Sequence, residues 1–343
     1  MISNLYERYS RQIVLKDIGI DGQEKILKAK VAVAGVGGLG SMVVSLLARM
    51  GVGELHIIDS DVVSLSDLHR QVLYDENDVG KPKVYAAKEK LGKINSNISV
   101  YTYPISVNNF DELERIISKV DAVADGLDNM RARYNLNLAA VKHKKPYVFA
   151  SAIENYGNIS TIVPGETPCL NEFYSGFDEE GLPTCATVGV NPSVVTTIAS
   201  LESNEILHIL TGREPPFKGR LGILDLSMGT LESINLKKDD RCEVCDLRAR
   251  PLREPDTEIS CSKDGMSTIF INRPFGDVDL DQISIDEVQR SKDYLKGTYK
   301  GFMFTIYRTG YAVALYRGYF DGLEKEALNA YAEVVRKGNT RKA

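Results

Sequence analysis

The strongest constraint on the fold of this chain is a glycine-rich turn that follows an apolar run near the N-terminus. The turn has the spacing Gly35-x-Gly37-x-x-Gly40, and we expect a helix after it from about Ser41 to Met50. Glycines in this spacing let the backbone turn tightly and lie close to a phosphate group, while the first turn of the helix offers free N–H groups to an anion. The turn therefore predicts a nucleotide-binding fold.

The remainder of the first 250 residues alternates short apolar strands with helices. We expect strands at 53–59, 98–105, 121–127 and 147–153, helices near 83–92, 110–118 and 131–143, and a hairpin at 219–236. An irregular crossing segment at 166–188 precedes a helix that Asn191 and Pro192 begin and Gly212 ends. Short apolar strands separated by helices are typical of a parallel sheet covered on both faces. The sequence predicts an α/β fold, doubly wound and Rossmann-like, with a mainly parallel sheet.

A second unit follows a change of composition near Pro251 and Pro255. We expect short strands at 267–272, 301–307 and 310–317 and a last helix near 322–336. This pattern predicts a small C-terminal α+β module at 251–343, after an ATP-binding domain at 1–250, with a linker at 248–262. The tail is rich in tyrosine, and we expect these side chains to pack a sheet face on its helix, or else to dock a protein. They are Tyr299, Tyr307, Tyr311, Tyr316 and Tyr319.

Composition narrows the classes of function. Of 343 residues, 42 are Lys or Arg and 47 are Asp or Glu, so the net charge is −5, which argues against a general nucleic-acid or membrane-surface binder. No apolar stretch approaches the roughly 18 residues needed to cross a bilayer, and the first eight residues lack a signal-peptide core. Five cysteines are too few for a disulfide scaffold in a chain of this length. We expect a cytoplasmic protein with no nucleic-acid or membrane partner.

The segment after Asp59 favours a triphosphate as the ligand. Asp59 ends a predicted strand, where it is placed to accept hydrogen bonds from ribose hydroxyls. Beyond it, Arg70 and Lys83 are cations that could neutralise further phosphates. Asp128 follows another predicted strand, where a carboxylate could hold Mg²⁺. An NAD-dependent oxidoreductase shares the first half of this fold and is the alternative. A non-catalytic binding module is a third hypothesis, and the intact cations argue against it.

Five motifs in order make the chain resemble the ubiquitin-activating enzyme superfamily, specifically its ThiF/MoeB/HesA-type adenylyltransferases. The resemblance covers about residues 5–250. Its motifs are Arg8-Tyr9-Ser10-Arg11-Gln12 with Asp21-Gly22-Gln23-Glu24, the glycine turn, Asp59 to Gln71, Gly80-Lys81-Pro82-Lys83, and Asp125 to Asn129. The resemblance implies ATP-dependent adenylation of the C-terminal Gly-Gly carboxylate of a small ubiquitin-like or sulfur-carrier protein. Pyrophosphate would be released, and transfer to a thiol or sulfur nucleophile would follow.

The same resemblance implies roles for individual residues. Arg11 would reach the phosphates from the partner subunit of a homodimer, and Asp128 would serve magnesium. Asp67 departs from the family, which usually has Asn there, and the extra charge would either weaken ATP binding or add a magnesium contact. Arg70 and Lys83 complete the expected catalytic set with Arg11, Asp128 and Cys185. The expected nucleotide contacts are Gly35, Gly37, Gly38, Gly40, Asp59, Ser66, Asp67, Leu68, His69, Arg70, Lys83, Asp128, Asn129 and Arg133.

Two cysteines have the spacing of half a structural zinc site. Cys242-x-x-Cys245 is such a pair, and by the resemblance the other half should follow Pro168. Cys169 is present there, but Glu172 stands where a second cysteine is expected. Glu172 or Cys261 could supply the fourth ligand, or zinc could be absent.

Cys185 is expected to act in a second step. It lies shortly before the Asn191 helix start, and many relatives carry there the cysteine that forms a thioester, acyl disulfide or persulfide. A thiolate close to a helix N-terminus can be stabilised and made reactive near neutral pH. The alternative is a buried structural cysteine.

Overall fold

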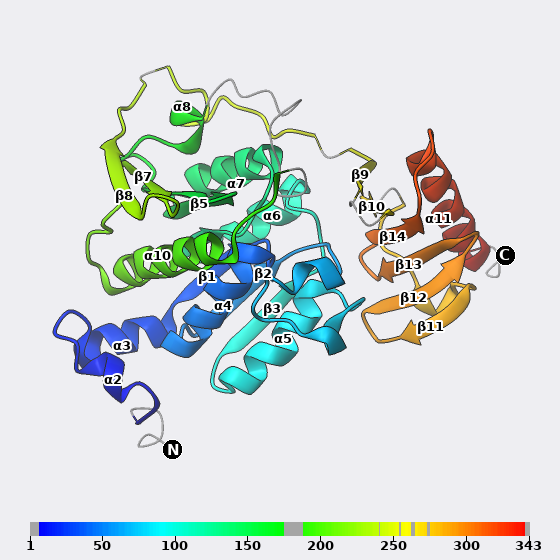
Figure 1. Ribbon diagram of the computed structural model, residues 1–343, viewed down its shortest axis with the longest axis horizontal. Helices are drawn as coiled ribbons and strands as arrows, with labels where there is room; N and C mark the ends of the chain where they lie inside the picture. The colour runs from blue at the N-terminus through cyan, green and yellow to red at the C-terminus, as the bar shows by residue number, and fades with distance from the viewer. Residues whose placement is uncertain are drawn as a thin grey trace.

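A computed structural model describes residues 7–174, 188–239, 241–253, 255–261, 265–272 and 275–339. It contains two sheets, one in each of two lobes that lie side by side (Figure 1). In the part of the chain described, no helix is both long and apolar enough to cross a membrane.

The first sheet has eight strands in the order β3-β2-β1-β4-β5-β6-β7-β8. Its strands are β1 Lys30–Ala34, β2 Glu54–Ile58, β3 Ser99–Tyr103, β4 Ala122–Asp125, β5 Tyr147–Ile153, β6 Tyr156–Ile162, β7 Arg220–Asp225 and β8 Thr230–Asn235. Pairing is parallel from β3 to β5 and antiparallel from β5 to β8. The predicted doubly wound, mainly parallel α/β fold is therefore confirmed.

Helices cover both faces of this sheet. They are α2 Ser10–Ile13, α3 Gly19–Lys28, α4 Gly38–Met50, α5 Lys83–Ile94, α6 Phe110–Ile117, α7 Met130–Lys142, α8 Leu170–Phe173 and α10 Pro192–Thr211. Side chains of a strand alternate between faces. Val31 and Val33 accordingly join one buried cluster with residues of α4 and α10, whereas Ala32 and Ala34 join another with residues of α6 and α7. This alternation places β1 at the centre of the layered core.

Local departures from the predicted elements have physical causes. Helix α4 begins at Gly38, earlier than the expected Ser41, because Gly37 is its N-cap and the glycine turn forms its first turn. Strand β6 was not predicted, because Gly157 and Asn158 in its sequence are typical of turns. Gly157 is needed in the strand, since a Cβ there would lie 2.3 Å from Cγ1 of Ile198 in α10.

The second sheet is antiparallel, in the order β11-β12-β13-β14-β10-β9. Its elements are β9 Thr257–Cys261, β10 Met266–Ile271, β11 Asp286–Arg290, β12 Tyr294–Tyr299, β13 Phe302–Tyr307, β14 Ala312–Arg317 and α11 Leu323–Asn339. The predicted C-terminal α+β module is confirmed. The predicted end of the linker at residue 262 is wrong, because β9 already begins at Thr257.

The tyrosines of this module pack in two different places. Tyr299 and Tyr316 pack against the module's own core, as expected. Tyr307 and Tyr311 instead belong to the buried cluster that includes Val62 of the first lobe. Because the two lobes share this cluster, the domain boundary at 250 stays a prediction.

Candidate functional site

Glycines bring three segments together at the carboxyl edge of the parallel strands. Gly35 has φ 82°, and a Cβ on it would lie 2.5 Å from the carbonyl oxygen of Gly126 in the loop after β4. A Cβ on Gly40 would lie 1.9 Å from the carbonyl oxygen of Gly35. No residue with a side chain fits these positions without moving backbone. The turn after β1, the start of α4 and the loop after β4 therefore form one compact edge.

Asp59 fixes the shape of the glycine turn. It follows β2, and its Oδ2 accepts a hydrogen bond of 2.9 Å from the backbone N–H of Val36, while its Oδ1 accepts one of 2.8 Å from Asp61 N–H. The carboxylate predicted to bind ribose thus lies directly beside the turn predicted to bind phosphate. Binding of a ribose by Asp59 stays a prediction.

Lys83 is buried among carboxylates. It begins α5 and is only 5% exposed, with its Nζ 2.6 Å from Asp61 Oδ2 and 3.6 Å from Asp67 Oδ2. Burial by itself would lower the pKa of Lys83, but the negative charges of Asp61, Asp67 and Asp59 raise it well above its usual value. Lys83 is therefore a permanent cation at this edge. Asp61, which the sequence reasoning left without a role, is its nearest partner.

Arg70 lies over the first turn of α4. A Cβ on Gly38 would contact Arg70 Cδ at 3.8 Å. Its guanidinium donates to the carbonyl oxygen of Ser66 at 3.0 Å and pairs with Asp67 Oδ1 at 3.4 Å. His69 contacts the same guanidinium at 3.0 Å, and partial burial together with Arg70 lowers the pKa of His69.

Asp67 occupies a central position in this arrangement. It is buried, ends the short 3₁₀ turn Leu65–Asp67, and accepts a hydrogen bond from Ser64 N–H at 2.9 Å. Its two oxygens then pair with Arg70 and with Lys83. The charge in place of the family's usual Asn therefore holds together the two cations predicted to bind phosphate. Leu68, the next residue, packs on the apolar core below and anchors the segment.

Asp128 and Asn129 lie exposed on the loop after β4, which also carries Gly126. The Asn129 side chain caps α7 by accepting from Ala132 N–H at 2.9 Å, and its Nδ2 donates to Asp128 Oδ1 at 3.3 Å. Since Gly126 touches the glycine turn, the Asp128 carboxylate lies on the same edge as the predicted nucleotide. An accessible carboxylate oxygen there suits a hard cation such as Mg²⁺.

Arg133 lies behind this loop and is almost fully buried. Its Nη2 donates to the carbonyl oxygens of Leu127 at 2.6 Å and Ala150 at 2.9 Å, and its Nε pairs with Asp125 Oδ2 at 3.1 Å. The side chain predicted to contact the nucleotide thus donates to the loop backbone, to the backbone of β5 and to Asp125. Its observed contacts are those of a group that fixes where Asp128 stands.

Sequence reasoning missed a buried network beneath the same loop. Tyr147 donates to Asp125 Oδ2 at 2.5 Å, and Glu202 Oε1 accepts from Asp125 N–H at 2.6 Å. Burial raises the pKa of Glu202 well above its usual value, which favours the protonated form of its carboxyl group. The sequence signal for this network was Glu202, a carboxylate among apolar residues of the helix α10.

Arg11 lies at the opposite end of α4. The neighbouring Tyr9 packs on Gly51, and Gln12 Nε2 donates to the carbonyl oxygen of Met50 at 3.1 Å. Helix α4 has 13 residues and separates this end from the glycine turn by roughly 20 Å. Arg11 is exposed there and is not brought together with the other predicted residues within one chain.

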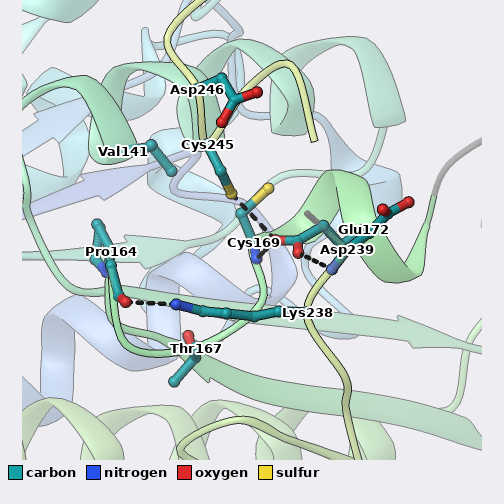
Figure 2. Close-up of a pocket in the computed structure, with 10 residues that line it drawn as sticks. Val141, Pro164, Thr167, Cys169, Glu172, Lys238, Asp239, Cys245 and Asp246 are labelled. Atoms are coloured by element: carbon teal, nitrogen blue, oxygen red, sulfur yellow. Dashed lines mark hydrogen bonds between the residues drawn. The ribbon is translucent and has the colours of Figure 1, made fainter. Parts of the chain in front are cut away.

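Three cysteines and a glutamate meet on the other face of the sheet, beside α8. The donor atoms of Cys169, Glu172, Cys242 and Cys245 all lie within 4.8 Å of one another. The Sγ atoms of Cys169 and Cys242 are 3.5 Å apart, and Cys245 Sγ is 3.1 Å from Glu172 Oε2. Figure 2 shows the Glu172 side chain pointing toward Cys169 and Cys245, at the edge of a cavity of about 220 Å³.

This donor set fits zinc. Tetrahedral zinc with bonds of about 2.3 Å holds its sulfur ligands about 3.8 Å apart, close to the spacing found here. Backbone N–H groups of Cys169 and Asp239 donate to Glu172 at 2.5 and 2.7 Å and orient its carboxylate. Burial raises the pKa of Cys169 to about 12, so its thiol stays protonated near neutral pH unless a cation lies beside it.

Two further cysteines were expected to have a role. Cys185 lies outside the described residues. Cys261 belongs to β9, in the second sheet, where its backbone pairs with Ser267. Cys169, Glu172, Cys242 and Cys245 already supply four donors without Cys261. This favours Glu172 as the fourth ligand.

Comparison with known proteins gives a consistent result. Residues 9–244 match the ThiF family. The chain is 38% identical over 256 residues to the adenylyltransferase and sulfurtransferase MOCS3 of Xenopus laevis, covering 74% of this chain but only 56% of that protein. It is 35% identical over 245 residues to the sulfur carrier protein adenylyltransferase of Thermus thermophilus, covering 70% of this chain and 90% of that one. Among solved structures, Escherichia coli MccB with ATP matches with a TM-score of 0.61 and 27% identity, covering 69% of this chain and 74% of that chain.

Proposed function

The chain belongs to the ThiF family, and from this premise we propose that it is an ATP-dependent adenylyltransferase. Its substrate is the C-terminal carboxylate of a small sulfur-carrier or ubiquitin-like protein ending in Gly-Gly. The observation that carries the proposal is the group formed by Arg70, Lys83 and Asp67 above the glycine turn, on the same edge of the sheet as the accessible Asp128. Cations held by exchangeable carboxylates suit a ligand that brings several negative charges.

The reaction is an in-line displacement. A carboxylate oxygen of the carrier attacks the α-phosphorus of ATP, the bond from that phosphorus to the bridging oxygen breaks, and pyrophosphate leaves with the electron pair. Arg70 and Lys83 exchange carboxylate partners for phosphate oxygens and stabilise the charge that develops there. Magnesium, when bound, neutralises phosphate charge, and Asp128 would hold it. Arg133 keeps the loop of Asp128 in place.

The named relatives support this reaction over the NAD-dependent alternative. The Thermus protein is a sulfur carrier protein adenylyltransferase, and the Xenopus protein is an adenylyltransferase and sulfurtransferase. Neither is an oxidoreductase, so that alternative is not retained. The Xenopus protein is much longer than the matched region, and the sulfurtransferase part of its name is not carried over to the region matched here. The cytoplasmic setting stays a prediction.

A homodimer would complete the site. Arg11 lies roughly 20 Å from the glycine turn of its own chain, by the length of α4, so it acts on the phosphates of a partner subunit. Apolar side chains near it are exposed, Val14 by 75% and Leu15 by 54%. Exposed apolar groups beside a functional cation are what a subunit contact would cover.

The activated carrier then reacts with a sulfur or thiol nucleophile. We assign this step to Cys185, whose thiolate would attack the carbonyl carbon of the adenylate and release AMP, leaving a thioester. The cluster of Cys169, Glu172, Cys242 and Cys245 has a different role, which is to hold zinc as a structural ion.

Intact-mass analysis tests this sequence of steps. Enzyme, MgATP and a Gly-Gly carrier are incubated, and the masses of carrier and enzyme are read under non-reducing conditions. We expect an adenylated carrier and an enzyme–carrier adduct that a thiol reagent releases. Cys185→Ser should still give the adenylate but not the adduct, whereas an unchanged adduct would remove Cys185 from the second step. A carrier that is never adenylated would contradict the proposed function.

A further inference from the structure

The segment that carries the proposed phosphate-binding cations is a loop closed at its base. We call residues 59–83 the nucleotide loop. Val62 pairs with Pro82 in an antiparallel bridge, Val63 N–H donates to the carbonyl oxygen of Lys81 at 2.8 Å, and Gly80 N–H donates back to that of Val63 at 2.7 Å. Arg70 lies in the part that this short ladder closes, so the position of the ladder determines where Arg70 stands.

The C-terminal module contacts both sides of this ladder. The Tyr307 hydroxyl, on β13, donates to the carbonyl oxygen of Ser60 at 3.2 Å. Lys296, on β12, donates from Nζ to the carbonyl oxygen of Gly80 at 3.3 Å. Gly80 has φ 82°, a left-handed backbone conformation that favours glycine, so the turn that presents this carbonyl depends on glycine.

Buried packing supports these two hydrogen bonds. Tyr294 stacks on Tyr85 of α5 with ring centres 5.7 Å apart. Tyr294 and Tyr307 belong to the same buried cluster as Val62, which lies within the ladder itself. Burial and the nearby Asp61 raise the pKa of Tyr307 well above its usual value, so its hydroxyl keeps the proton that it donates. The module and the ladder therefore share a buried interface.

We propose that the C-terminal module is a positioning element of the nucleotide site, in which Tyr307 and Lys296 hold the base of the nucleotide loop so that Arg70 and Lys83 meet the phosphates. The identity of the ligand rests on the proposed function, whereas the contacts of Tyr307 and Lys296 with the base of the loop do not. The family match ends at residue 244, before the module begins, so membership of the family assigns the module no role. The hydrogen bonds of Tyr307 and Lys296 to the loop go to backbone carbonyl groups, so these residues act on the ligand through that backbone.

The same interface provides a matched control. Tyr311 is also a buried tyrosine of the module, but its hydroxyl accepts from Asn109 Nδ2 at 2.8 Å, at the N-cap of α6. Tyr311→Phe therefore removes one buried hydroxyl from the module without touching the nucleotide loop. Tyr307→Phe and Lys296→Met remove the two contacts to the loop.

Hydrogen exchange and ATP kinetics of the full chain test the proposal. In Tyr307→Phe and in Lys296→Met we expect faster amide exchange in the nucleotide loop. We also expect a roughly fivefold higher KM for ATP in carrier-dependent pyrophosphate exchange, the change expected for one lost hydrogen bond of ordinary strength, with kcat nearly unchanged. Tyr311→Phe should raise amide exchange around α6 and leave the KM for ATP as it is.

The outcomes separate this proposal from the proposed function. Unchanged loop protection in both loop-contact variants, or equal changes in Tyr311→Phe, would overturn the positioning role. If the unmodified chain catalyses no pyrophosphate exchange but the loop still loses protection in Tyr307→Phe, the proposed adenylation is wrong and the positioning role of the module is supported. Lys296→Met keeps the test valid if Tyr307→Phe does not fold, because Lys296 is only half-buried.

Discussion

The nucleotide loop and the cysteine cluster (Cys169, Glu172, Cys242 and Cys245) both gather reactive side chains on the first lobe, but the charges of these side chains are arranged differently. Around the loop, Lys83 and Arg70 are paired with carboxylates, so both cations already have partners. In the cluster, the buried thiols of Cys169 and Cys242 lie side by side. Paired charges can exchange partners with a ligand that comes and goes. Three thiols and a carboxylate with their donor atoms gathered within 4.8 Å favour a metal cation that stays bound. We therefore expect the nucleotide loop to take part in catalysis and the cysteine cluster to stabilise the fold.

The largest expected effect falls on the first region. Arg70→Ala and Asp128→Ala should each lower carrier-dependent ATP–pyrophosphate exchange by about a hundredfold or more, since each removes an electrostatic contact to the transferring phosphates. The melting temperature should stay close to that of the unmodified chain. Arg115→Ala is the matched control, because Arg115 pairs on the surface with Glu112 of α6. Near-normal exchange in well-folded Asp128→Ala would remove the magnesium assignment.

A second test asks whether the first region is complete within one chain. Arg11→Ala should be inactive alone, and mixing it with Asp128→Ala should restore part of the exchange. In a mixed dimer, one site receives an intact Arg11 and an intact Asp128, so about a quarter of full activity should return when subunits pair at random. Subunit exchange is checked by native mass spectrometry. Mixed dimers without recovered activity would contradict a shared site.

The cysteine cluster should respond in stability and hardly at all in catalysis. Cys242→Ser should release bound zinc and lower the melting temperature by roughly 10 °C, while pyrophosphate exchange at 25 °C stays within about twofold. Metal content is read by elemental analysis and stability by calorimetry.

Glu172→Gln and Cys261→Ser form the matched pair for the fourth ligand. Glu172→Gln should weaken zinc binding by at least about tenfold, because the carboxylate charge is lost, and Cys261→Ser should leave it unchanged. The reverse result would show that Cys261, on β9, is the ligand and that the position of Glu172 is incidental.

Much of the first region was predictable because its determinants are local in sequence. The glycine turn, Asp59 and the strand–helix alternation are short patterns with strong steric and hydrogen-bonding consequences. The sequence did not reveal that Lys83 pairs with Asp61, or that Tyr307 reaches Ser60 across 247 positions. Such contacts depend on how whole elements pack. Strand β6 was missed for the same reason, since packing against α10 overrides the turn preference of Gly157.

The smallest effect concerns the residue that departs from the family. Asp67→Asn keeps an oxygen for Ser64 N–H but removes the charge that holds Arg70 and Lys83. These cations then meet phosphate without first leaving a carboxylate, so the KM for ATP should fall by roughly threefold to tenfold, with kcat changed less. Asp75→Asn, on the same loop but paired with Lys90, is the control. A higher KM in Asp67→Asn would mean that Asp67 assists the ligand, for example through magnesium.

Carrier-dependent ATP–pyrophosphate exchange tests the central claim most directly. Small proteins ending in Gly-Gly are offered one at a time with MgATP and labelled pyrophosphate, each beside a version that lacks the last glycine. We predict that at least one intact carrier drives label into ATP, that its truncated form does not, and that NAD neither supports the reaction nor stabilises the protein. Exchange that proceeds equally without any carrier, or a protein stabilised by NAD but not by MgATP, would contradict the assignment as an adenylyltransferase.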